Sequence, residues 1–233
     1  MTKPIALVSG VGPGTGKSIV QRFTRGGYTV AMLARSGERL AALEREIPGT
    51  LGVVCDVAKE SDVEAAVATV RATLGDPQVL IHNAVGGWFG TFLDIDPKIL
   101  NDNFQTNTMG LLHLAQRLAP AMIAAGTGAI VASGNTSATR GKATFAGFAP
   151  TKAAQRILAE SMARHLGPKG VHVAYVIVDA VIDLEWTRRL NSDKPDEFFC
   201  KPDDIADEIW HVAHQPRSAW SFNVEIRPFG EPW

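Results

Sequence analysis

Residues 9–16 read S-G-V-G-P-G-T-G and lie between an apolar run, Ile5–Ser9, and a segment of helical periodicity. Gly10, Gly14 and Gly16 let the backbone bend tightly and approach a bound group, and the following helix points its positive end at an anion. The spacing G-x-x-x-G-x-G differs from the commoner G-x-G-x-x-G, so the interpretation rests mainly on the position of the turn between a strand and a helix. We predict a dinucleotide-binding turn, the alternative being a tight turn without a ligand. The candidate contacts are Ser9, Gly10, Gly14, Thr15 and Gly16.

Lys17 and Ser18 directly follow this turn and give it a superficial likeness to the phosphate loop G-x-x-x-x-G-K-S/T. In that register the first glycine of the motif falls on Val11, so the outer glycine is missing. The sequence therefore favours a dinucleotide over a nucleoside triphosphate.

Short apolar runs alternate with longer segments of helical periodicity along the whole chain. Most of the runs are nearly continuous in apolar residues, as in strands that are buried on both faces of a parallel sheet. No linker, repeat or change of composition divides the sequence. We predict one domain over residues 1–233, an α/β Rossmann fold with a doubly wound, seven-stranded parallel sheet and helices on both faces. The predicted strands are Ile5–Ser9, Thr29–Leu33, Leu51–Cys55, Val79–His82, Ala129–Ser133, Val171–Val178 and Phe222–Ile226.

Two long helical patterns and one irregular segment complete this organisation. The helical patterns run from about residue 103 to 125 and from about 149 to 167. Residues 183–201 are charged, contain Trp186 and interrupt the alternation of strands and helices. In doubly wound sheets, insertions after the carboxyl end of a strand commonly cover the ligand. We predict a substrate lid at 183–201, with a solvated surface loop as the alternative.

The composition argues against several classes of function. The formal net charge is −1, so no excess of basic residues favours binding to nucleic acid or to an anionic membrane. No apolar run reaches the ~20 residues of a membrane span. The first residues lead into a strand without a targeting segment. Cys55 and Cys200 lie far apart and outside metal-binding spacings, which predicts a reduced, cytoplasmic chain without a metal site.

The end of the second predicted strand indicates which dinucleotide is bound. Proteins that bind NAD usually place Asp or Glu there to accept a hydrogen bond from the ribose 2′-hydroxyl. Ala34 takes that place here and Arg35 follows, and a guanidinium suits a 2′-phosphate. We therefore predict NADP(H) as the cofactor, in contact with Arg35 and Ser36. A solvated arginine at the start of a helix is the alternative.

With these features the chain resembles the short-chain dehydrogenase/reductase family over essentially its full length. In the segment that is usually Asn-Asn-Ala-Gly in the family, Asn83 and Ala84 match, whereas His82 and Val85 depart. We expect His82 to be a buried residue at a strand end. Asp56, followed by Val57, implies a contact with the adenine, and a helix N-cap is a compatible role. The resemblance rests on residues 9–16, Asp56-Val57, H-N-A-V at 82–85, N-T-M-G at 107–110 and Lys152.

The family's active site consists of Asn, Ser, Tyr and Lys, with Tyr four residues before Lys and Ser thirteen before Tyr. Asn107 and Lys152 match the first and last of these. The tyrosine position is Phe148 and the serine position is Asn135, so two of the four roles are altered. A sub-group of the family is similar in having Phe at this place and Asp after the sixth strand. The resemblance implies that Lys152 holds the nicotinamide ribose, and Asn135 is suited to donate its amide N–H to a substrate oxygen.

Another source for the proton has to be sought, because a phenyl ring has none to exchange. Neither Tyr28 nor Tyr175 precedes a lysine by four residues, so neither restores the motif. Water, a hydroxyl at Thr136 or Ser137, or Asp179 with a raised pKa are the candidates. A carboxylate at Asp179 would alternatively favour the positively charged oxidised nicotinamide. A plain turn residue is its third possible role.

We expect an NADP(H)-dependent oxidoreductase that transfers a hydride to or from a carbonyl or alcohol. The alternatives are a catalytically impaired NADP(H)-binding sensor or partner protein, and non-redox chemistry on the same scaffold. The substrate is expected to be a small molecule with an apolar part, and the resemblance implies a homodimer or homotetramer. Four aromatic residues are suited to line an apolar pocket or to pack ordinarily, namely Trp88, Phe89, Phe92 and Trp186.

Overall fold

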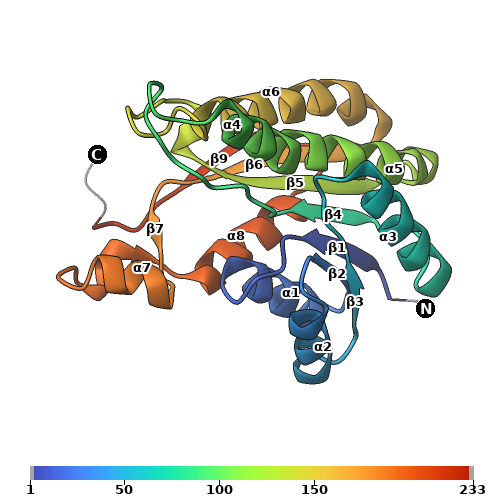
Figure 1. The fold of residues 1–233 in the computed structure, drawn as a ribbon. Helices are drawn as coiled ribbons and strands as arrows, with labels where there is room; N and C mark the ends of the chain where they lie inside the picture. Colours follow the sequence, from blue (N-terminus) through green and yellow to red (C-terminus); the bar gives the residue numbers. More distant parts are fainter. Residues whose placement is uncertain (1–2, 231–233) are drawn as a thin grey trace.

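Seven parallel strands form the central sheet, in the order β3-β2-β1-β4-β5-β6-β9 (Figure 1). The computed structural model describes residues 3–230. All seven predicted strands are confirmed, each within two residues of its expected ends. They are β1 (Ile5–Ser9), β2 (Thr29–Ala34), β3 (Thr50–Val54), β4 (Val79–His82), β5 (Gly128–Asn135), β6 (Val171–Val178) and β9 (Asn223–Ile226).

The strand order reverses at β1, which has β2 on one side and β4 on the other. At its carboxyl end Ser9 is level with Leu33 of β2 and His82 of β4. The connections after β1 and β4 leave in opposite directions from such a reversal, which opens a crevice between them. The glycine-rich turn follows β1 directly, so it lies at this crevice.

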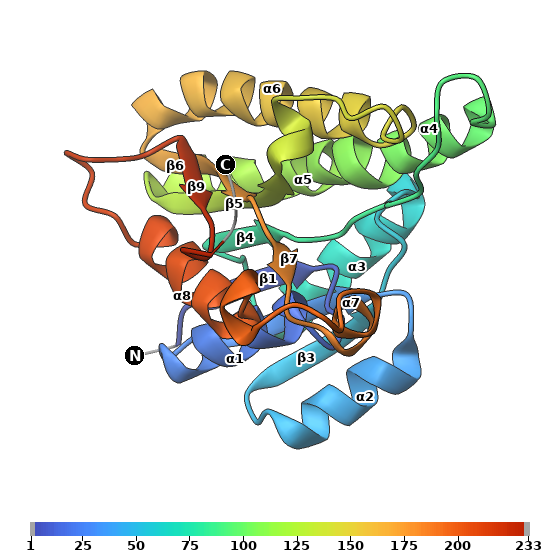
Figure 2. The same ribbon diagram turned by 90° about the vertical axis from the view of Figure 1, so that its left-hand side faces the viewer.

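Helices cover both faces of the sheet (Figures 1 and 2). Each helix presents an apolar stripe to the sheet. The buried side chains of helices and strands form two separate cores, one on each face of the sheet. One face carries α3 (Glu60–Thr73), α5 (Gly110–Ala125) and α6 (Ala149–Leu166). The other carries α1 (Thr15–Arg25), α2 (Gly37–Glu46) and α8 (Pro202–Ala213).

The helix expected from about residue 103 begins earlier and is not uniform. It starts as α4 (Pro97–Phe104), where the Asp96 side chain accepts a hydrogen bond from the Lys98 N–H at 2.8 Å. A π-helical turn, Gln105–Met109, separates α4 from α5. The extra residue in a π turn shifts the phase of the apolar pattern, so a search for one continuous 3.6-residue period misses α4. α8 is also absent from the predicted helices.

The segment predicted as an irregular lid has its own secondary structure. β7 (Val181–Ile182) pairs with β8 (Phe199–Cys200), and α7 (Glu185–Leu190) lies between them. Figure 2 shows α7 and β7 in front of the edge of the sheet at which the strands end. The segment is therefore a small folded unit rather than a structureless loop.

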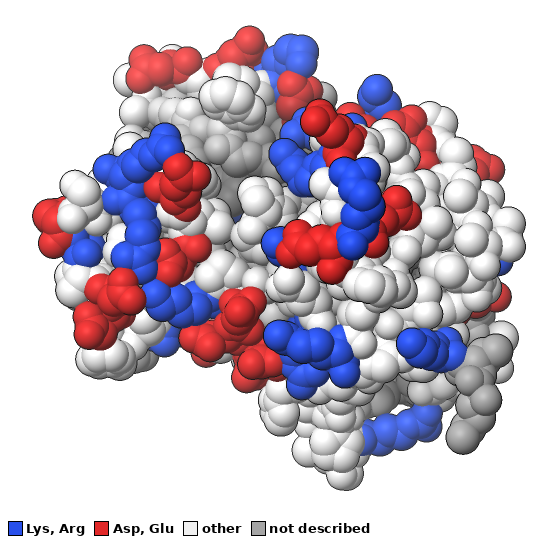
Figure 3. Space-filling view, turned by 90° about the horizontal axis from the view of Figure 1, so that it is seen from below, with Lys and Arg blue, Asp and Glu red and all other residues white. Residues whose placement is uncertain are grey.

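Basic and acidic side chains are mixed in small groups over the face shown in Figure 3. No extended area of a single sign appears on that face. Within residues 3–230, no helix combines the length and the apolar character that crossing a membrane would require.

The backbone at Gly10 generates a stability prediction. Its φ is +77°, and a Cβ at this position would lie 2.4 Å from backbone atoms of Ala84. Gly10→Ala should therefore lower the free energy of unfolding by at least about 1–3 kcal/mol, the usual cost of backbone strain at a non-glycine residue. Gly12→Ala is the control, because a Cβ at Gly12 meets no atom within 4 Å. Urea denaturation of the nucleotide-free proteins measures both, and equal stabilities for the two variants would contradict this reading of the turn.

Candidate active site

A cleft of about 1710 Å³ opens at the carboxyl ends of the strands around the crevice between β1 and β4. The glycine-rich turn, the ends of β2 and β3, the segment after β4 and the predicted lid all contribute to its walls. Its volume exceeds the range of ~300–1,000 Å³ usual for small-ligand pockets, which leaves room for a dinucleotide together with a substrate. The predicted cofactor contacts that line it are Gly10, Gly14, Thr15, Gly16, Arg35, Ser36, Asp56, Val57, Asn83 and Ala84.

The glycine-rich turn closes on itself and on the end of β4. A Cβ at Gly16 would lie 2.6 Å from the Gly10 carbonyl oxygen, so only glycine fits there without movement of the backbone. The Asn83 amide donates to the same Gly10 oxygen at 3.0 Å. The first helix begins immediately after this turn, so its free N–H groups face the cleft, as a pyrophosphate site requires. The residues present therefore fit a dinucleotide.

Ser9 was predicted to contact the cofactor, but the structure does not bring it to the cleft. It is fully buried, and its hydroxyl lies 3.0 Å from Nδ1 of His82. Burial, with the nearby charge of Lys152, lowers the pKa of His82 to about 3. His82 is therefore a neutral, buried residue at a strand end, as expected, and Ser9 supports it.

Two arginines line the cleft beside the end of β2. Arg35 follows β2, and Arg39 lies one turn further along α2. Ser36 caps this helix, because its hydroxyl accepts a hydrogen bond from the Arg39 N–H at 3.3 Å. Both guanidinium groups are exposed, and no carboxylate of residues 3–230 forms an ion pair with either. Arg39 was missed, although its spacing of four from Arg35 is the helical signal that would have found it.

Asp56 lines the cleft but is not a helix N-cap, so that expected role is wrong. Lys59 occupies the N-cap position of α3. One oxygen of Asp56 instead accepts a hydrogen bond from the Ala58 N–H at 3.2 Å, which fixes the turn between β3 and the helix.

Asn107 lies in the π-helical turn and is fully buried. Its side-chain oxygen accepts a hydrogen bond from the Gly86 N–H at 2.9 Å. Its amide nitrogen donates to the Thr151 hydroxyl at 2.8 Å and to the Gly86 carbonyl at 3.0 Å. Asn107 therefore joins the segment after β4 to the start of α6, and its side chain does not face the cleft.

Phe148 precedes α6 and is 3% exposed. The centroid of its ring lies 5.3 Å from that of Phe89 and 6.2 Å from that of Phe145, both in edge-to-face geometry. Such a cluster is apolar and offers no exchangeable proton. The position expected to hold the family's tyrosine is thus part of a small aromatic cluster, none of whose three residues lines the cleft.

The Lys152 side chain lies on the buried face of α6. Its ammonium donates to the Ser133 carbonyl at 3.1 Å and to Oε1 of Gln155 at 2.5 Å. Burial lowers the pKa of Lys152 to about 7. No tyrosine stands in for Phe148, although the Tyr175 hydroxyl reaches the same Gln155 oxygen at 3.1 Å. Gln155 meets Lys152 through a spacing of three residues on α6, whereas Tyr175 joins them through the packing of α6 against β6, which no register of the sequence motif indicates.

Asn135 and Asp179 are fixed by local contacts at the ends of β5 and β6. Asn135 accepts a hydrogen bond from the Ser137 N–H at 3.1 Å, and its amide nitrogen bonds to no residue within 3–230. The Asp179 carboxylate lies between Arg140 at 3.3 Å and Arg227 at 3.6 Å. Two cations are the opposite of the apolar surroundings that a neutral carboxylic acid needs, so the structure argues against Asp179 as the proton donor.

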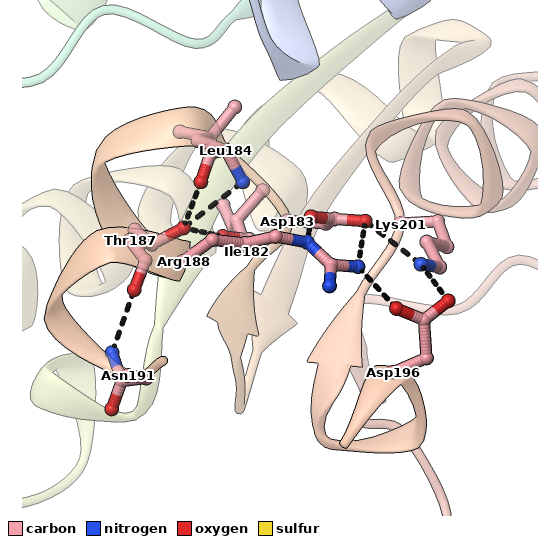
Figure 4. A network of polar contacts seen from close by, with 8 residues as sticks. All are labelled: Ile182, Asp183, Leu184, Thr187, Arg188, Asn191, Asp196 and Lys201. Atoms are coloured by element: carbon pink, nitrogen blue, oxygen red, sulfur yellow. Dashed lines mark hydrogen bonds and ion pairs between the residues drawn. The ribbon is translucent and has the colours of Figure 1, made fainter. Parts of the chain in front are cut away.

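The segment predicted as a lid rests on the glycine-rich turn. A Cβ at Gly14 would lie 2.3 Å from Cδ2 of Leu184, so the leucine covers the turn directly. Figure 4 shows how the segment is held together: Arg188 pairs with Asp183 at 2.5 Å and with Asp196 at 2.7 Å. Lys201 contacts the same two carboxylates, at 2.8 and 3.2 Å. The Arg188 hydrogen bond, helped by Lys201, holds the pKa of Asp183 well below its usual range.

The four aromatic residues predicted for an apolar pocket divide into two groups. Trp88 and Trp186 line the cleft and are 71% and 61% exposed, so ordinary core packing does not describe them. Phe89 packs against the ring of Phe148. Phe92 is exposed and does not line the cleft. Among residues 3–230, no group of three or more His, Cys, Asp or Glu side chains is placed to hold a metal ion.

Comparison with known proteins agrees with this architecture. The family model described as short chain dehydrogenase matches residues 4–194. D-erythrulose reductase from Gallus gallus is 32% identical over 169 residues, covering 72% of this chain and 67% of the relative. Carbonyl reductase (NADPH) 2 from Sus scrofa is 30% identical over 217 residues, covering 88% and 86%. A metagenomic short-chain oxidoreductase solved with NADP has a TM-score of 0.85 at 28% identity, with 97% of each chain covered. The chain belongs to the short-chain dehydrogenase family.

Proposed function

We propose that this chain is an NADP(H)-dependent oxidoreductase that transfers a hydride to or from a carbonyl or alcohol. The observation that carries the proposal is the cleft, which is lined by the glycine-rich turn and by the guanidiniums of Arg35 and Arg39, neither of which forms an ion pair within residues 3–230. A relative named for NADPH and a structural neighbour bound to NADP support the same cofactor.

The residues that line the cleft suit the adenosine and pyrophosphate parts of the cofactor, while Lys152 and Asn135 lie outside its lining. Arg35 and Arg39 would hold the 2′-phosphate, because guanidinium groups match phosphate oxygens. Asp56 and Val57 would contact the adenine, and the glycine-rich turn would hold the pyrophosphate. Lys152 would act at the nicotinamide ribose and Asn135 would orient a substrate oxygen. NADP(H) supplies the hydride when it is bound, so the residues need only position the reactants and manage a proton.

The proton is the step for which the chain lacks the family's usual group. Losing a positioned general acid typically reduces a rate by about 10²–10⁴-fold, which many enzymes can tolerate. Thr136, Ser137 or a water molecule remain candidates, because the two hydroxyl residues lie in the turn directly after β5, where Asn135 accepts a hydrogen bond from the Ser137 N–H. We therefore expect slow turnover rather than none.

A sensor or partner protein that binds NADP(H) without turnover is the second candidate. The apolar surroundings of Phe148 and the ion pairs of Asp179 favour it, since neither position supplies a proton. Mixing the protein with NADPH and a broad panel of carbonyl compounds separates the two functions. Consumption of NADPH would support the oxidoreductase, whereas tight binding without consumption would support the sensor.

Trp88 and Trp186 support a small-molecule substrate with an apolar part, because indole rings at a cleft mouth contribute large contact areas. The 183–201 segment would act as the substrate lid, since Leu184 already covers the turn and Trp186 lies at the wall. We retain a homodimer or homotetramer and a cytoplasmic location as predictions for this chain.

The choice between NADPH and NADH tests the role of Arg35. Arg35→Ala should weaken NADPH binding by about 10- to 100-fold, the equivalent of a hydrogen bond to a charged group of ~1.5–3 kcal/mol. NADH, which lacks the 2′-phosphate, should bind almost unchanged. Arg45→Ala is the control, because Arg45 lies on the same helix outside the cleft. Titration calorimetry measures all four affinities, and equal losses for the two nucleotides would rule out this role.

Restoring a hydroxyl at position 148 tests the altered active site. Phe148→Tyr should give modest carbonyl-reductase activity, and adding Asn135→Ser should raise it further. The hydroxyl enters an apolar cluster, so without a partner it should cost about 1–3 kcal/mol of stability. Phe145→Tyr is the matched control, because its ring belongs to the same cluster. Stopped-flow absorbance gives the rates and melting curves give the stability. A folded, NADPH-binding double variant that reduces no carbonyl would count against the oxidoreductase.

A further inference from the structure

A buried polar cluster centred on Gln155 lies beside the proposed active site. Oε1 of Gln155 accepts hydrogen bonds from the Lys152 ammonium at 2.5 Å and from the Tyr175 hydroxyl at 3.1 Å. Its amide nitrogen donates to the main-chain carbonyl of Asn107 at 2.7 Å. These four residues are at most 2% exposed. One side chain therefore joins α6, β6 and the π-helical turn.

Local sequence explains how this cluster is built. Gln155 follows Lys152 by three residues, a spacing that places both on one face of α6. Gly134 on β5 makes room for the tyrosine, because a Cβ there would lie 2.2 Å from the Tyr175 hydroxyl oxygen. The Ser133 carbonyl beside it accepts the second hydrogen bond of the ammonium. The cluster thus requires particular residues on three elements.

The charge of Lys152 has no opposite charge to balance it. No carboxylate of residues 3–230 forms an ion pair with it, and none of the titratable groups around it carries a negative charge. His82 faces it from β4 and is neutral, while burial raises the pKa of Tyr175 on β6. Arg156 on α6 adds a further positive charge near Tyr175. The ammonium therefore depends on two neutral oxygens, one from Ser133 and one from Gln155, and on the Tyr175 ring, whose centroid lies 6.0 Å from Nζ.

We propose that Gln155 is a positioning residue that holds the Lys152 ammonium in place and keeps it charged. Phe148 has no hydroxyl group that could take this role. The part of this inference that concerns the cofactor rests on the proposed function, in which Lys152 acts at the nicotinamide ribose. The part that concerns the charge of Lys152 depends only on the contacts within this chain.

The direction of the effect follows from which form of the lysine side chain the hydrogen bond to Gln155 stabilises. An acceptor oxygen stabilises the ammonium relative to the neutral amine, so removing it lowers the pKa of the lysine. Gln155→Leu should therefore shift the titration of Lys152 from about 7 to lower pH. Gln155→Glu should shift it to higher pH, because a carboxylate favours the ammonium more strongly than an amide does.

Carbon NMR of lysine-labelled protein measures this titration directly, with the Lys152 signal identified by its loss in Lys152→Met. We expect the ionisation constant to change at least about tenfold in Gln155→Leu, in line with the loss of a charged hydrogen bond. Tyr175→Phe keeps the amide oxygen and should not lower the pKa of Lys152. Gln116→Leu, on the exposed face of α5, controls for the substitution itself. An unchanged Lys152 titration in folded Gln155→Leu would overturn the proposal.

Gln155→Glu provides a second route if the leucine variant does not fold. The same carbon signal should then titrate at higher pH than in the wild type, and an unchanged midpoint would overturn the proposal. NADPH affinity across the same pH range, compared with Lys152→Met as the baseline, tests the cofactor part. The NADPH affinity should fall as rising pH removes the charge of Lys152. This fall should occur at lower pH in Gln155→Leu than in the wild type. A wild type that binds no NADPH would contradict the proposed function, and the carbon titration would still decide the role of Gln155.

Discussion

The contact between Gly10 and the backbone of Ala84 sets the position of the groups around the cleft. It holds the glycine-rich turn against the end of β4, where the strand order reverses. From there a chain of hydrogen bonds continues inward. Asn83 donates to the Gly10 carbonyl and accepts from the Ser133 hydroxyl at 2.8 Å, and the Ser133 carbonyl accepts from Lys152. The glycine-rich turn and the buried lysine are thus parts of one connected structure.

The sequence predicted the sheet well because most of its strands, all but β3 and β9 at its two edges, are largely buried on both faces. A nearly continuous apolar run is a strong local signal, and glycines mark the ends of the elements. The prediction was weaker where the backbone departs from a regular period. The π-helical turn at 105–109 changes the phase between α4 and α5, and α7 lies in a segment whose charges pair with one another. Such ion pairs replace an apolar stripe, so periodicity gives no indication of the helix.

The site was predictable where a motif fixes the backbone, and unpredictable where tertiary contacts decide. Gly10 and Arg35 face the cleft as expected, because the turn and the strand end determine their positions. Ser9 does not, because the sequence does not reveal that His82 on the neighbouring strand takes its hydroxyl. The surroundings of Asp179 depend on Arg140, 39 residues away, and Arg227, so its expected role as an acid had no local basis. Chain spacing likewise misses Tyr175, whose hydroxyl reaches the Lys152 carbonyl and the Gln155 side chain because α6 packs against β6.

A buried lysine without a carboxylate partner is an expensive group for a fold to keep. Taking an ammonium out of water disfavours its charged form, which is why the pKa of Lys152 falls to about 7. An apolar side chain of similar length would fill the same space without that cost. The fold instead surrounds the amine with oxygens from Ser133 and Gln155, and it anchors Gln155 in turn to Asn107. Departures from the most stable choice concentrate at functional sites. The retention of this supported amine beside Phe148, which has no exchangeable proton, therefore supports the role proposed for Lys152 at the nicotinamide ribose.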